Sequence, residues 1–531
     1  MIGSSNPLSA EPLVTRPSTK PCTVTLFNNE AFNDYSAHPL SFTPPAGCAG
    51  PWAKVVLTID FTVTAGRQYD RTASLYLGNA NIFYGTTAEP RTTVSPSWHV
   101  ERDLTDLSAI FQTAQTGQAI IYNIFNTTYN GGIYGTAQLE FYPANLKNPP
   151  PVVPTAVVPV SGVNSPYELD TTASELKTTF TAPRNTIKAY LDVISQSQSG
   201  DEFWYLGAPN DVANELETYG NTAFRETEIS IDGKPAGVAP VYPWIFTGGI
   251  DPYLWEPLPG VQTLNFKPYR VDLTPFAGVL SDGEPHTIGL SVFNANSYFL
   301  ATANLLLYTD PQLKQTTGAL LENTLTAAPT PDVAENLTTD GTGAVVGTVT
   351  VDSKREFRIR GYVTTSQGRT ETTVEQTVHF NSGQTFNVGA SEIQNVLQTS
   401  TVKAKTTTKI GPLETVEETH TSFPLTLDYS FLANADGTYS QIVSSDQNYV
   451  VKDATTLNGL ELTSSSVKEQ VKSSDTLKYN SSVTAITAIG PTASSASYVS
   501  RNSDGTCDKM ELASASLKLT EATGNTACPK D

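Results

Sequence analysis

Residues 66–90 read GRQYDRTASLYLGNANIFYGTTAEP, and this stretch carries the pattern from which the fold class is inferred. Apolar side chains occupy every second position of residues 73–77, which is the period of a half-buried β-strand. The pair Gly78-Asn79 favours a turn, and residues 82–84 then resume an apolar and aromatic run. The stretch therefore predicts two antiparallel strands joined by a short turn.

Charged residues stand at both ends of this predicted hairpin. Asp70 and Arg71 come directly before its first strand, and Glu89 follows its second strand. Carboxylates and a guanidinium at strand ends on a rigid scaffold are well placed for chemistry on a polar substrate. The alternative is that Asp70 and Arg71 form a solvated ion pair at the rim of the sheet.

The composition extends the prediction to the whole chain. Thr, Ser, Val, Tyr and Phe are abundant among the 531 residues, with 36 Gly and 35 Pro, and no long helical periodicity interrupts them. We therefore predict an all-β protein with two adjacent jelly-roll-like β-sandwiches that form a cleft, plus a third β-rich C-terminal domain. A formal net charge of −20 argues against nucleic acid or an anionic membrane as a partner, because either would repel the chain.

Shifts in composition and a Pro-rich segment divide the chain. The predicted parts are an N-terminal arm (1–20), a first β-sandwich (21–148), a Pro-rich linker (149–160), a second β-sandwich (161–312) and a C-terminal β-rich domain (313–531). Two segments of the first sandwich, 69–79 and 100–107, resemble 223–233 and 269–276 of the second. This similarity indicates either two units built on one plan or only the common pattern of strands and turns.

The cysteines and the glycosylation sequences indicate a secreted protein. The cysteines favour two disulfides that are local in sequence, although three connectivities are possible: Cys22 with Cys48, and Cys507 with Cys528. Three Asn-x-Ser/Thr sequences read as glycosylation acceptors: Asn126, Asn336 and Asn480. Residues 1–5 lack the basic start and apolar core of a signal peptide, so we expect a mature or trimmed extracellular chain.

Several motifs occur in the same order as in a known enzyme family. They lie at residues 22–26, 66–71 with 86–90, 202–205, 224–226, 245–249 and 269–275. Together they resemble the peptide-N-glycosidase A family of plants and fungi. The resemblance implies a secreted glycoamidase that acts on N-glycosylated peptides and glycoproteins. Such an enzyme hydrolyses the side-chain amide between asparagine and the first GlcNAc, giving aspartate and a released glycan by way of a glycosylamine and ammonia.

This reaction requires an activated water and groups that stabilise both the oxyanion and the leaving amine. The five histidines lack the spacing of metal ligands, and the sequence contains no Gly-x-Ser-x-Gly motif. We therefore expect a metal-independent enzyme without a cofactor, in which carboxylates perform the chemistry.

The resemblance also points to the catalytic residues. Residues 69–71 are similar to the Tyr-Asp-Arg of the bacterial peptide-N-glycosidase F, which implies Asp70 as general base or substrate-orienting carboxylate. Arg71 would hold Asp70 or the scissile amide. The bacterial Glu-Trp-Cys-Phe-Arg string is divided here between residues 202–204 and 224–225, and it implies Glu202 as the partner acid. We expect Asp70 and Glu202 to lie across one cleft, close enough to share a water.

Further residues are predicted to bind substrate: Glu89, Trp98, Asn123, Trp204, Arg225, Glu226 and Trp255. Glu89 or Asn123 takes the place of a bacterial glutamate that has no counterpart here, and the tryptophans offer flat faces to sugars. Each has an alternative. Glu89 accepts loop N–H bonds only, Arg225 and Glu226 form a cross-strand pair, and the tryptophans belong to the core.

Two other classes of function stay open. The chain suits a carbohydrate-binding β-sandwich protein without catalysis, and Asp70 with Glu202 would suit an endoglycosidase that cuts between the two core GlcNAc residues. Members of the family are often cut into two chains that stay together. This makes Lys354-Arg355 a candidate processing site, although a basic pair in a strand is usually only surface.

Overall fold

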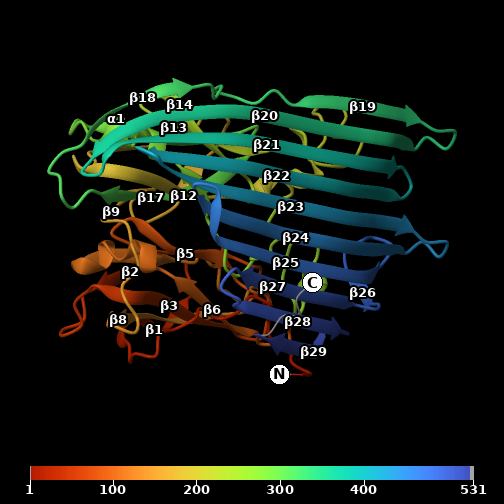
Figure 1. The fold of residues 1–531 in the computed structure, drawn as a ribbon. Coiled ribbons are helices and arrows are strands. Elements are labelled where there is room, and N and C mark those ends of the chain that lie inside the picture. The colour runs from red at the N-terminus through yellow and green to blue at the C-terminus, as the bar shows by residue number, and fades with distance from the viewer. Residues whose placement is uncertain (1, 527–531) are drawn as a thin grey trace.

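The computed structural model describes residues 2–526, and their strands form five sheets (Figure 1). Four of these sheets pair into two sandwiches, and the fifth is a single long sheet formed by the C-terminal part of the chain. The prediction of an all-β protein with two sandwiches and a β-rich C-terminal region is confirmed.

The first sandwich packs the sheet β1-β8-β3-β6 on the sheet β2-β7-β4-β5, and apolar residues of both sheets form one core. Its strands are β1 (Cys22–Phe32), β2 (Ala37–Phe42), β3 (Trp52–Val63), β4 (Thr72–Leu77), β5 (Ala80–Thr86), β6 (Ser97–Asp103), β7 (Gln115–Ile120) and β8 (Ile133–Pro143). The short turns η1 (Thr105–Leu107) and η2 (Ile110–Gln112) connect β6 to β7. This order of eight strands is that of a jelly roll.

Strands β4 and β5 form the hairpin that the sequence predicts. Gly78 and Asn79 turn between them with φ angles of 56° and 66°, a left-handed conformation that Gly and Asn adopt at low cost. The prediction that the first strand is half-buried is wrong, because both strands are buried on both faces. The second sandwich covers their outer side: Tyr84 joins its core, and Asn304 Nδ2 donates to Asn81 O at 2.9 Å.

The second sandwich repeats the strand order of the first. It packs the sheet β10-β17-β12-β15 on the sheet β11-β16-β13-β14, and a further strand, β9, pairs with β17. Its strands are β9 (Ala156–Val160), β10 (Tyr167–Leu169), β11 (Leu176–Phe180), β12 (Thr186–Gln198), β13 (Glu226–Ile231), β14 (Lys234–Pro240), β15 (Tyr269–Asp272), β16 (His286–Phe293) and β17 (Tyr298–Thr309). Strand β9 lies inside segment 149–160, so the second half of the predicted linker belongs to a sheet.

The repeated sequence motifs occupy equivalent places in the two sandwiches. Strand β6 leads into η1, and β15 leads in the same way into η6 (Thr274–Phe276). Asp103 Oδ1 accepts the Thr105 N–H at 3.0 Å, and Asp272 Oδ1 accepts the Thr274 N–H at 2.9 Å. Because the strand order and these turns both recur, the two sandwiches are built on one plan.

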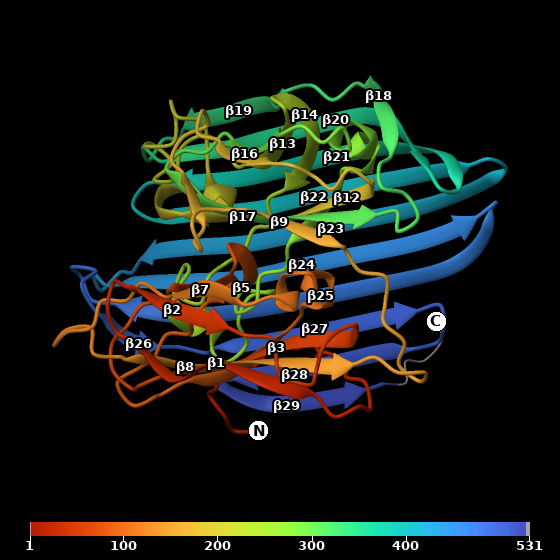
Figure 2. The same ribbon diagram turned by 90° about the vertical axis from the view of Figure 1, so that its left-hand side faces the viewer.

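The third part is a sheet of twelve strands that extends along both sandwiches (Figures 1 and 2). Its strands are β18 (Thr317–Asn323), β19 (Asp332–Thr339), β20 (Val345–Thr365), β21 (Gly368–Val388), β22 (Glu392–Ile410), β23 (Leu413–Ala433), β24 (Tyr439–Leu457), β25 (Leu460–Tyr479), β26 (Ile486–Ile489), β27 (Ala493–Asn502), β28 (Cys507–Ala515) and β29 (Lys518–Asn525). Alternate apolar residues such as Phe357, Phe380 and Leu425 enter the core of the second sandwich. The sheet therefore shares its core with that sandwich.

The N-terminal arm is bound along its length. The N–H of Gly3 donates to the carbonyl of Leu519 in β29 at 2.8 Å, and Arg16 pairs with Glu101 in β6 at 2.7 Å. The arm therefore links the edge of the large sheet to the first sandwich.

The cysteines agree with the prediction as far as the described residues extend. Cys22 and Cys48 form a disulfide with their Cα atoms 6.4 Å apart. Cys528 lies outside the described residues, so its pairing with Cys507 stays a prediction. Of the predicted glycosylation sites, Asn126 and Asn336 are exposed and Asn480 is half-buried. None of the helices in residues 2–526 has the length and apolar character needed to cross a membrane.

Candidate active site

Asp70, Glu89 and Gly248 meet where the two sandwiches touch. Asp70 directly precedes β4, Glu89 follows β5, and Gly248 lies in the loop between β14 and η5 (Pro252–Trp255). The Gly248 N–H donates to Asp70 Oδ2 at 3.0 Å, and the Asp70 N–H donates to Glu89 Oε1 at 3.2 Å. The Asp70 carboxylate therefore accepts a backbone N–H of the second sandwich, and Glu89 accepts the backbone N–H of Asp70.

The loop that carries Gly248 is fixed by its neighbours. Thr247 Oγ1 donates to the carbonyl of Thr87 at 2.6 Å, and Trp255 Nε1 donates to the carbonyl of Gly249 at 2.8 Å. A Cβ at position 248 would overlap Glu89 Oε1 and lie 3.2 Å from Asp70 Oδ1, so a side chain there would have to displace the Glu89 carboxyl group. The missing side chain leaves room for the Glu89 carboxyl group beside Gly248, while the Gly248 N–H bonds Asp70.

The environment gives these two acids different proton affinities. Burial and the charge of Asp70 raise the pKa of Glu89 to about 8, so Glu89 is mostly protonated at neutral pH. Burial also raises the pKa of Asp70, but the Gly248 N–H and the Arg71 charge act in the opposite direction and favour its carboxylate. The arrangement therefore suits one ionised acid beside one neutral acid.

Glu202 brings a third acid from the second sandwich. It follows the turn η3 (Ser199–Asp201) at the end of β12. Burial, and then the negative charge of Asp70, raise the pKa of Glu202 to about 7. The structure thus places Asp70 and Glu202 within electrostatic reach of each other, from two different sandwiches. Among residues 2–526, no three His, Cys, Asp or Glu side chains lie close enough together to hold a metal ion.

The turn before Glu202 is held by a buried ion pair. Arg225 donates to Asp201 Oδ1 through Nε at 3.0 Å and through Nη2 at 2.8 Å. Asp201 Oδ2 accepts the N–H groups of Asn296 and Ser297 at 2.8 and 2.7 Å. Only 2% of Arg225 is exposed, so the prediction that it binds substrate is wrong in this structure. Its position indicates that it orients the turn that carries Glu202.

Arg71 is oriented by two side chains. Its Nη2 donates to Gln68 Oε1 at 2.9 Å, and its Nε lies 3.4 Å from Asn123 Oδ1. Asn123 is buried and donates through Nδ2 to the carbonyl of Phe32 at 3.1 Å. Asn123 therefore supports Arg71 from behind, and the prediction that it contacts substrate directly is not favoured.

The predicted tryptophans lie in the interior. Trp98, Trp204 and Trp255 are 5%, 1% and 2% exposed and pack within the apolar cores, so their faces are not open to a sugar. The alternative that they are core residues is the correct one. The geometry explains this outcome, since large rings fill the space between two stacked sheets.

Glu226 is also buried, and it belongs to the contact with the large sheet. It forms an ion pair with Arg355 of β20, which also bonds Glu228 at 3.0 Å. The prediction that Glu226 binds substrate is therefore wrong. The same contact argues against cleavage at Lys354-Arg355, because Arg355 is buried and β20 is paired with β21 along its length.

The sequence patterns missed Glu256. Burial raises its pKa to about 7, and it forms an ion pair with Arg91. The charge of Glu256 contributes in turn to the raised pKa of Glu89. Glu256 precedes Pro257 in a Pro-rich loop. Such loops have no hydrophobic periodicity from which a buried position could be predicted.

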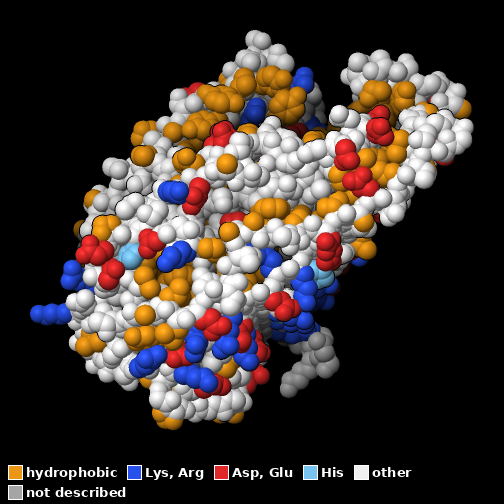
Figure 3. Space-filling view, turned by 90° about the horizontal axis from the view of Figure 1, so that it is seen from above, with side chains coloured by type: hydrophobic (Ala, Val, Ile, Leu, Met, Phe, Trp, Pro, Cys, Tyr) orange, Lys and Arg blue, Asp and Glu red, His pale blue; other side chains and the backbone are white. Residues whose placement is uncertain are grey.

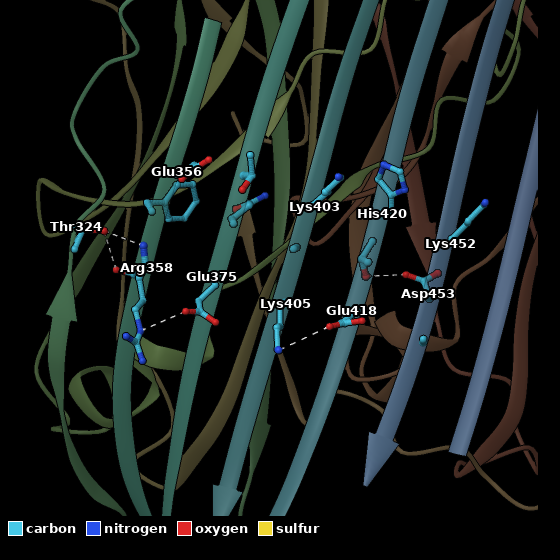
Figure 4. A pocket seen from close by; sticks show the side chains of 16 residues that line it. Thr324, Glu356, Arg358, Glu375, Lys403, Lys405, Glu418, His420, Lys452 and Asp453 are labelled. Atoms are coloured by element: carbon cyan, nitrogen blue, oxygen red, sulfur yellow. Dashed lines mark hydrogen bonds and ion pairs between the residues drawn. The ribbon is translucent and has the colours of Figure 1, made fainter. Parts of the chain in front are cut away.

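A surface hollow of about 780 Å³ lies on the third sheet, lined by charged residues of β20 to β24 (Figure 4). Arg358 lies 3.8 Å from Glu375, and Lys405 lies 3.9 Å from Glu418. Figure 3 shows that positive and negative side chains are intermixed on the molecular surface. The hollow includes none of the acids around Asp70, so we do not assign it as the candidate active site.

The chain is similar to a known relative in sequence and more weakly to solved structures. The chain is 29% identical over 480 residues to peptide-N4-(N-acetyl-beta-glucosaminyl)asparagine amidase A of Prunus dulcis, covering 85% of this chain and 81% of the relative. Among solved structures, PNGF-II gives a TM-score of 0.38 at 14% identity, over 55% of this chain and 66% of that chain. Recombinant peptide: N-glycanase F gives 0.37 at 16%, over 55% and 96%.

The sequence model of one protein family matches more than half of the chain. The family is described as peptide N-acetyl-beta-D-glucosaminyl asparaginase amidase A, and the match covers residues 12–326. This range includes both sandwiches, Asp70, Glu89 and Glu202. Because the match spans more than half of the chain, the protein belongs to this family of amidases.

Proposed function

We propose that this protein is a secreted glycoamidase that hydrolyses the side-chain amide between asparagine and the first GlcNAc of N-glycosylated peptides. The observation that carries the proposal is the meeting of Asp70, Glu89 and the Gly248 N–H at the contact of the two sandwiches. Glu202 of the second sandwich lies within electrostatic reach of Asp70, and all three acids have raised pKa values. Membership of the amidase family supports it. The Cys22–Cys48 disulfide supports an extracellular location.

In the first step Asp70 acts as the general base. Glu89 keeps its proton, so Asp70 carries the negative charge of the pair, stabilised by the Gly248 N–H and by Arg71. Asp70 takes a proton from a water molecule, whose oxygen attacks the side-chain carbonyl carbon of the glycosylated asparagine. Arg71 uses Nε and Nη2 toward Asn123 and Gln68, so its Nη1 group is the donor assigned to the developing oxyanion.

In the second step Glu202 acts as the general acid. With a pKa of about 7 it holds a proton below neutral pH and donates it to the amide nitrogen as the carbon–nitrogen bond breaks. The products are an aspartate on the peptide and a glycosylamine, which water then converts into the free glycan and ammonia. Asp70 and Glu202 carry the same functional group, and their different roles follow from their different environments.

The proposal is tested by analysing the products from one glycopeptide. A glycoamidase converts the glycosylated asparagine into aspartate. The product peptide is about one dalton heavier than the same peptide with an unglycosylated asparagine, because the amide NH2 is replaced by OH. The enzyme also releases a glycan with an intact reducing-end GlcNAc. A product peptide that keeps one GlcNAc would indicate an endoglycosidase instead, and an unchanged glycopeptide would indicate binding without catalysis.

The raised pKa of Glu202 predicts how activity depends on pH. We expect kcat/KM to be highest in mildly acidic solution and to fall as pH rises through about 7, because Glu202 then loses the proton that it must donate. The measurement is a profile of kcat/KM between pH 4 and pH 9 for the wild type and for Glu202→Gln, a range chosen to bracket the ordinary and raised carboxyl values. Glutamine cannot ionise, so the variant should be slower and should lose the decline near pH 7. If the decline persists in Glu202→Gln but disappears in Glu89→Gln, the proton donor is Glu89.

Gly248 offers a test of the backbone contact. We expect Gly248→Ala to lower kcat/KM at least tenfold, because the added methyl group displaces the Glu89 carboxyl and moves the N–H away from Asp70. Overpacking of this kind also costs about 1–3 kcal/mol of stability. The control is Gly341→Ala, since a Cβ at that position meets no atom within 4 Å. Equal activities in the two variants would contradict a role for the Gly248 N–H.

A further inference from the structure

The loop that carries Gly248 is bound by the large sheet as well as by the two sandwiches. We call residues 243–261 the Gly248 loop. Gln447 lies on β24 and is 0% exposed. Its Oε1 accepts the Val261 N–H at 2.7 Å, and its Nε2 donates to the carbonyl of Pro243 at 2.6 Å. A single side chain of the large sheet therefore joins the two ends of the Gly248 loop.

Gln441 holds the middle of the same loop. It precedes Gln447 on β24 by an even number of residues, so both side chains point to the same face of the sheet. Gln441 Nε2 donates to Asp251 Oδ2 at 2.6 Å. Asp251 Oδ1 accepts the N–H groups of Tyr253 and Leu254 at 3.0 and 3.1 Å. The buried Asp251 carboxyl group therefore joins the loop to the large sheet.

The contact at Asp251 lies close to the Gly248 N–H along the chain. The Asp251 N–H donates to the carbonyl of Gly249 at 2.9 Å, and the same carbonyl accepts Trp255 Nε1 at 2.8 Å. Gly248, which directly precedes Gly249, supplies the N–H that Asp70 Oδ2 accepts at 3.0 Å. A displacement of Asp251 would therefore move the Gly248 N–H relative to Asp70.

A second acid of the large sheet completes this contact. Asp475 lies on β25, the neighbour of β24, is 3% exposed and forms a hydrogen bond with Asp251. Apart from this bond, neither carboxyl oxygen of Asp475 has a hydrogen-bond partner among residues 2–526. Two carboxyl groups bond each other only when one of them carries a proton. Asp251 and Asp475 therefore share a proton in the buried contact.

The two acids keep this proton at neutral pH. Burial, and then the charge of Asp251, raise the pKa of Asp475 to about 8, and burial raises the pKa of Asp251. The other titratable groups that face the pair are Tyr253 of the loop, Tyr429 of β23 and Tyr479 of β25. Burial, with the charge of Asp251 as a further cause, raises the pKa of each tyrosine. The tyrosines therefore stay neutral, and only the two acids change charge as pH rises toward 8.

We propose that the large sheet positions the Gly248 N–H against the Asp70 carboxylate. Gln441 and Asp475 are the positioning residues, and they act through Asp251. This proposal rests on the function proposed above, and it makes the C-terminal part of the chain a component of the candidate active site. The loop stays closed while the two buried acids share a proton. Ionisation of both acids would place two negative charges side by side away from water and open the loop.

Hydrogen exchange of the Gly248 loop tests the hold of the large sheet. Exchange is measured by mass spectrometry after peptic digestion, as a protection factor relative to the same peptide unfolded. We expect Gln441→Met, which keeps the volume but removes the donor, to lower the protection of this loop roughly tenfold. The control is Gln398→Met. Gln398 is 1% exposed, and its side-chain nitrogen and oxygen have no partner in the described part of the chain. Unchanged protection in Gln441→Met would overturn the proposal.

The shared proton gives the wild type a pH dependence that one substitution removes. In the open loop the acids ionise near the ordinary carboxyl pKa of about 4, so closure weakens as pH rises from there to about 8. We expect the wild-type protection factor to fall roughly tenfold or more between about pH 6 and pH 8 and then to level off. Asp475→Asn offers an amide N–H to Asp251 at every pH, so its protection factor should stay nearly constant. An equal fall in Asp475→Asn would remove Asp475 from the positioning role.

Kinetics separate positioning from a purely structural role. The Gly248 N–H bonds Asp70 and not the substrate, so Gln441→Met should lower kcat roughly tenfold and leave KM nearly unchanged. Faster exchange with an unchanged kcat would mean that Gln441 only stabilises the fold, and the proposal would fail.

The exchange measurement does not depend on turnover. Faster exchange in Gln441→Met supports the hold of the large sheet on the Gly248 loop, even if the wild type releases no glycan. Unchanged exchange overturns this hold, even if the wild type proves to be a glycoamidase. Failure of the positioning proposal is therefore distinguishable from failure of the proposed function.

Discussion

Replacing Asp70 with asparagine is expected to lower kcat/KM for glycopeptide hydrolysis by roughly 10²–10⁴-fold, the contribution typical of a positioned general base. The amide has the same shape as the carboxyl group and still accepts the Gly248 N–H that Asp70 Oδ2 accepts at 3.0 Å. It cannot take a proton from water at any relevant pH. The variant should therefore fold normally and bind substrate, but turn over very slowly.

The comparison variant is Asp60→Asn, which makes the same substitution at an exposed carboxylate on β3. Asp60 lies 2.8 Å from His99 and its side chain is 69% exposed, so its loss should leave both stability and activity nearly unchanged. Both variants are assayed on one glycopeptide by mass spectrometry, and their thermal unfolding is recorded. Appreciable glycan release by Asp70→Asn would remove Asp70 from the role of base and leave Glu202 as the candidate.

A second readout of Asp70→Asn does not depend on catalysis. The charge of Asp70 is one cause of the raised pKa of both Glu89 and Glu202. Loss of that charge should lower both pKa values, which NMR titration of carboxyl-labelled protein would detect. Unchanged values would mean that burial alone perturbs these acids and that the three carboxyl groups are not coupled.

Local features of the fold could be predicted from the sequence. The alternation of residues 73–77 and the Gly78-Asn79 turn define a hairpin by themselves, because side-chain period and positive φ are properties of a few neighbouring residues. The burial of both hairpin faces could not be predicted. It depends on contact with β17, which lies more than 200 residues away in the chain, as the bond from Asn304 to Asn81 shows.

The candidate site, like the fold, could be predicted only in part. Motif resemblance selected Asp70, Arg71, Glu89 and Glu202. The structure brings Asp70 and Glu89 together beside Gly248 of the second sandwich, and the roles of all four residues stay proposals. Motif resemblance does not reveal what a side chain faces once the chain is folded. Arg225 reads like a substrate ligand but pairs with Asp201, because the fold brings two residues 24 positions apart into the same interior.

The contact made by Gly248 could not be predicted from the sequence either. Its sequence neighbourhood matches the family motif at 245–249, yet nothing in that motif indicates that its N–H meets a carboxylate 178 positions earlier in the chain.

Replacing Arg225 with methionine is expected to lower the free energy of unfolding by about 3–5 kcal/mol, the usual cost of leaving a buried charge without its partner. Methionine keeps most of the apolar volume but leaves Asp201 with only the N–H groups of Asn296 and Ser297. The control is Lys409→Met, because Lys409 bonds Glu414 at 2.8 Å with its side chain 58% exposed. Loss of that exposed pair should leave the free energy of unfolding nearly unchanged. Denaturant unfolding of the two variants gives the comparison.

The double variant Asp201→Leu with Arg225→Met separates stability from the positioning of Glu202. Removing both charges should recover much of the lost stability, because apolar residues often replace a buried ion pair without penalty. Activity should stay low, since Asp201 no longer holds the turn to Asn296 and Ser297 and Glu202 loses its orientation toward Asp70. Recovery of activity together with stability would mean that the pair acts only on folding. Low activity in a stable protein would identify Asp201 and Arg225 as positioning residues that act through Glu202.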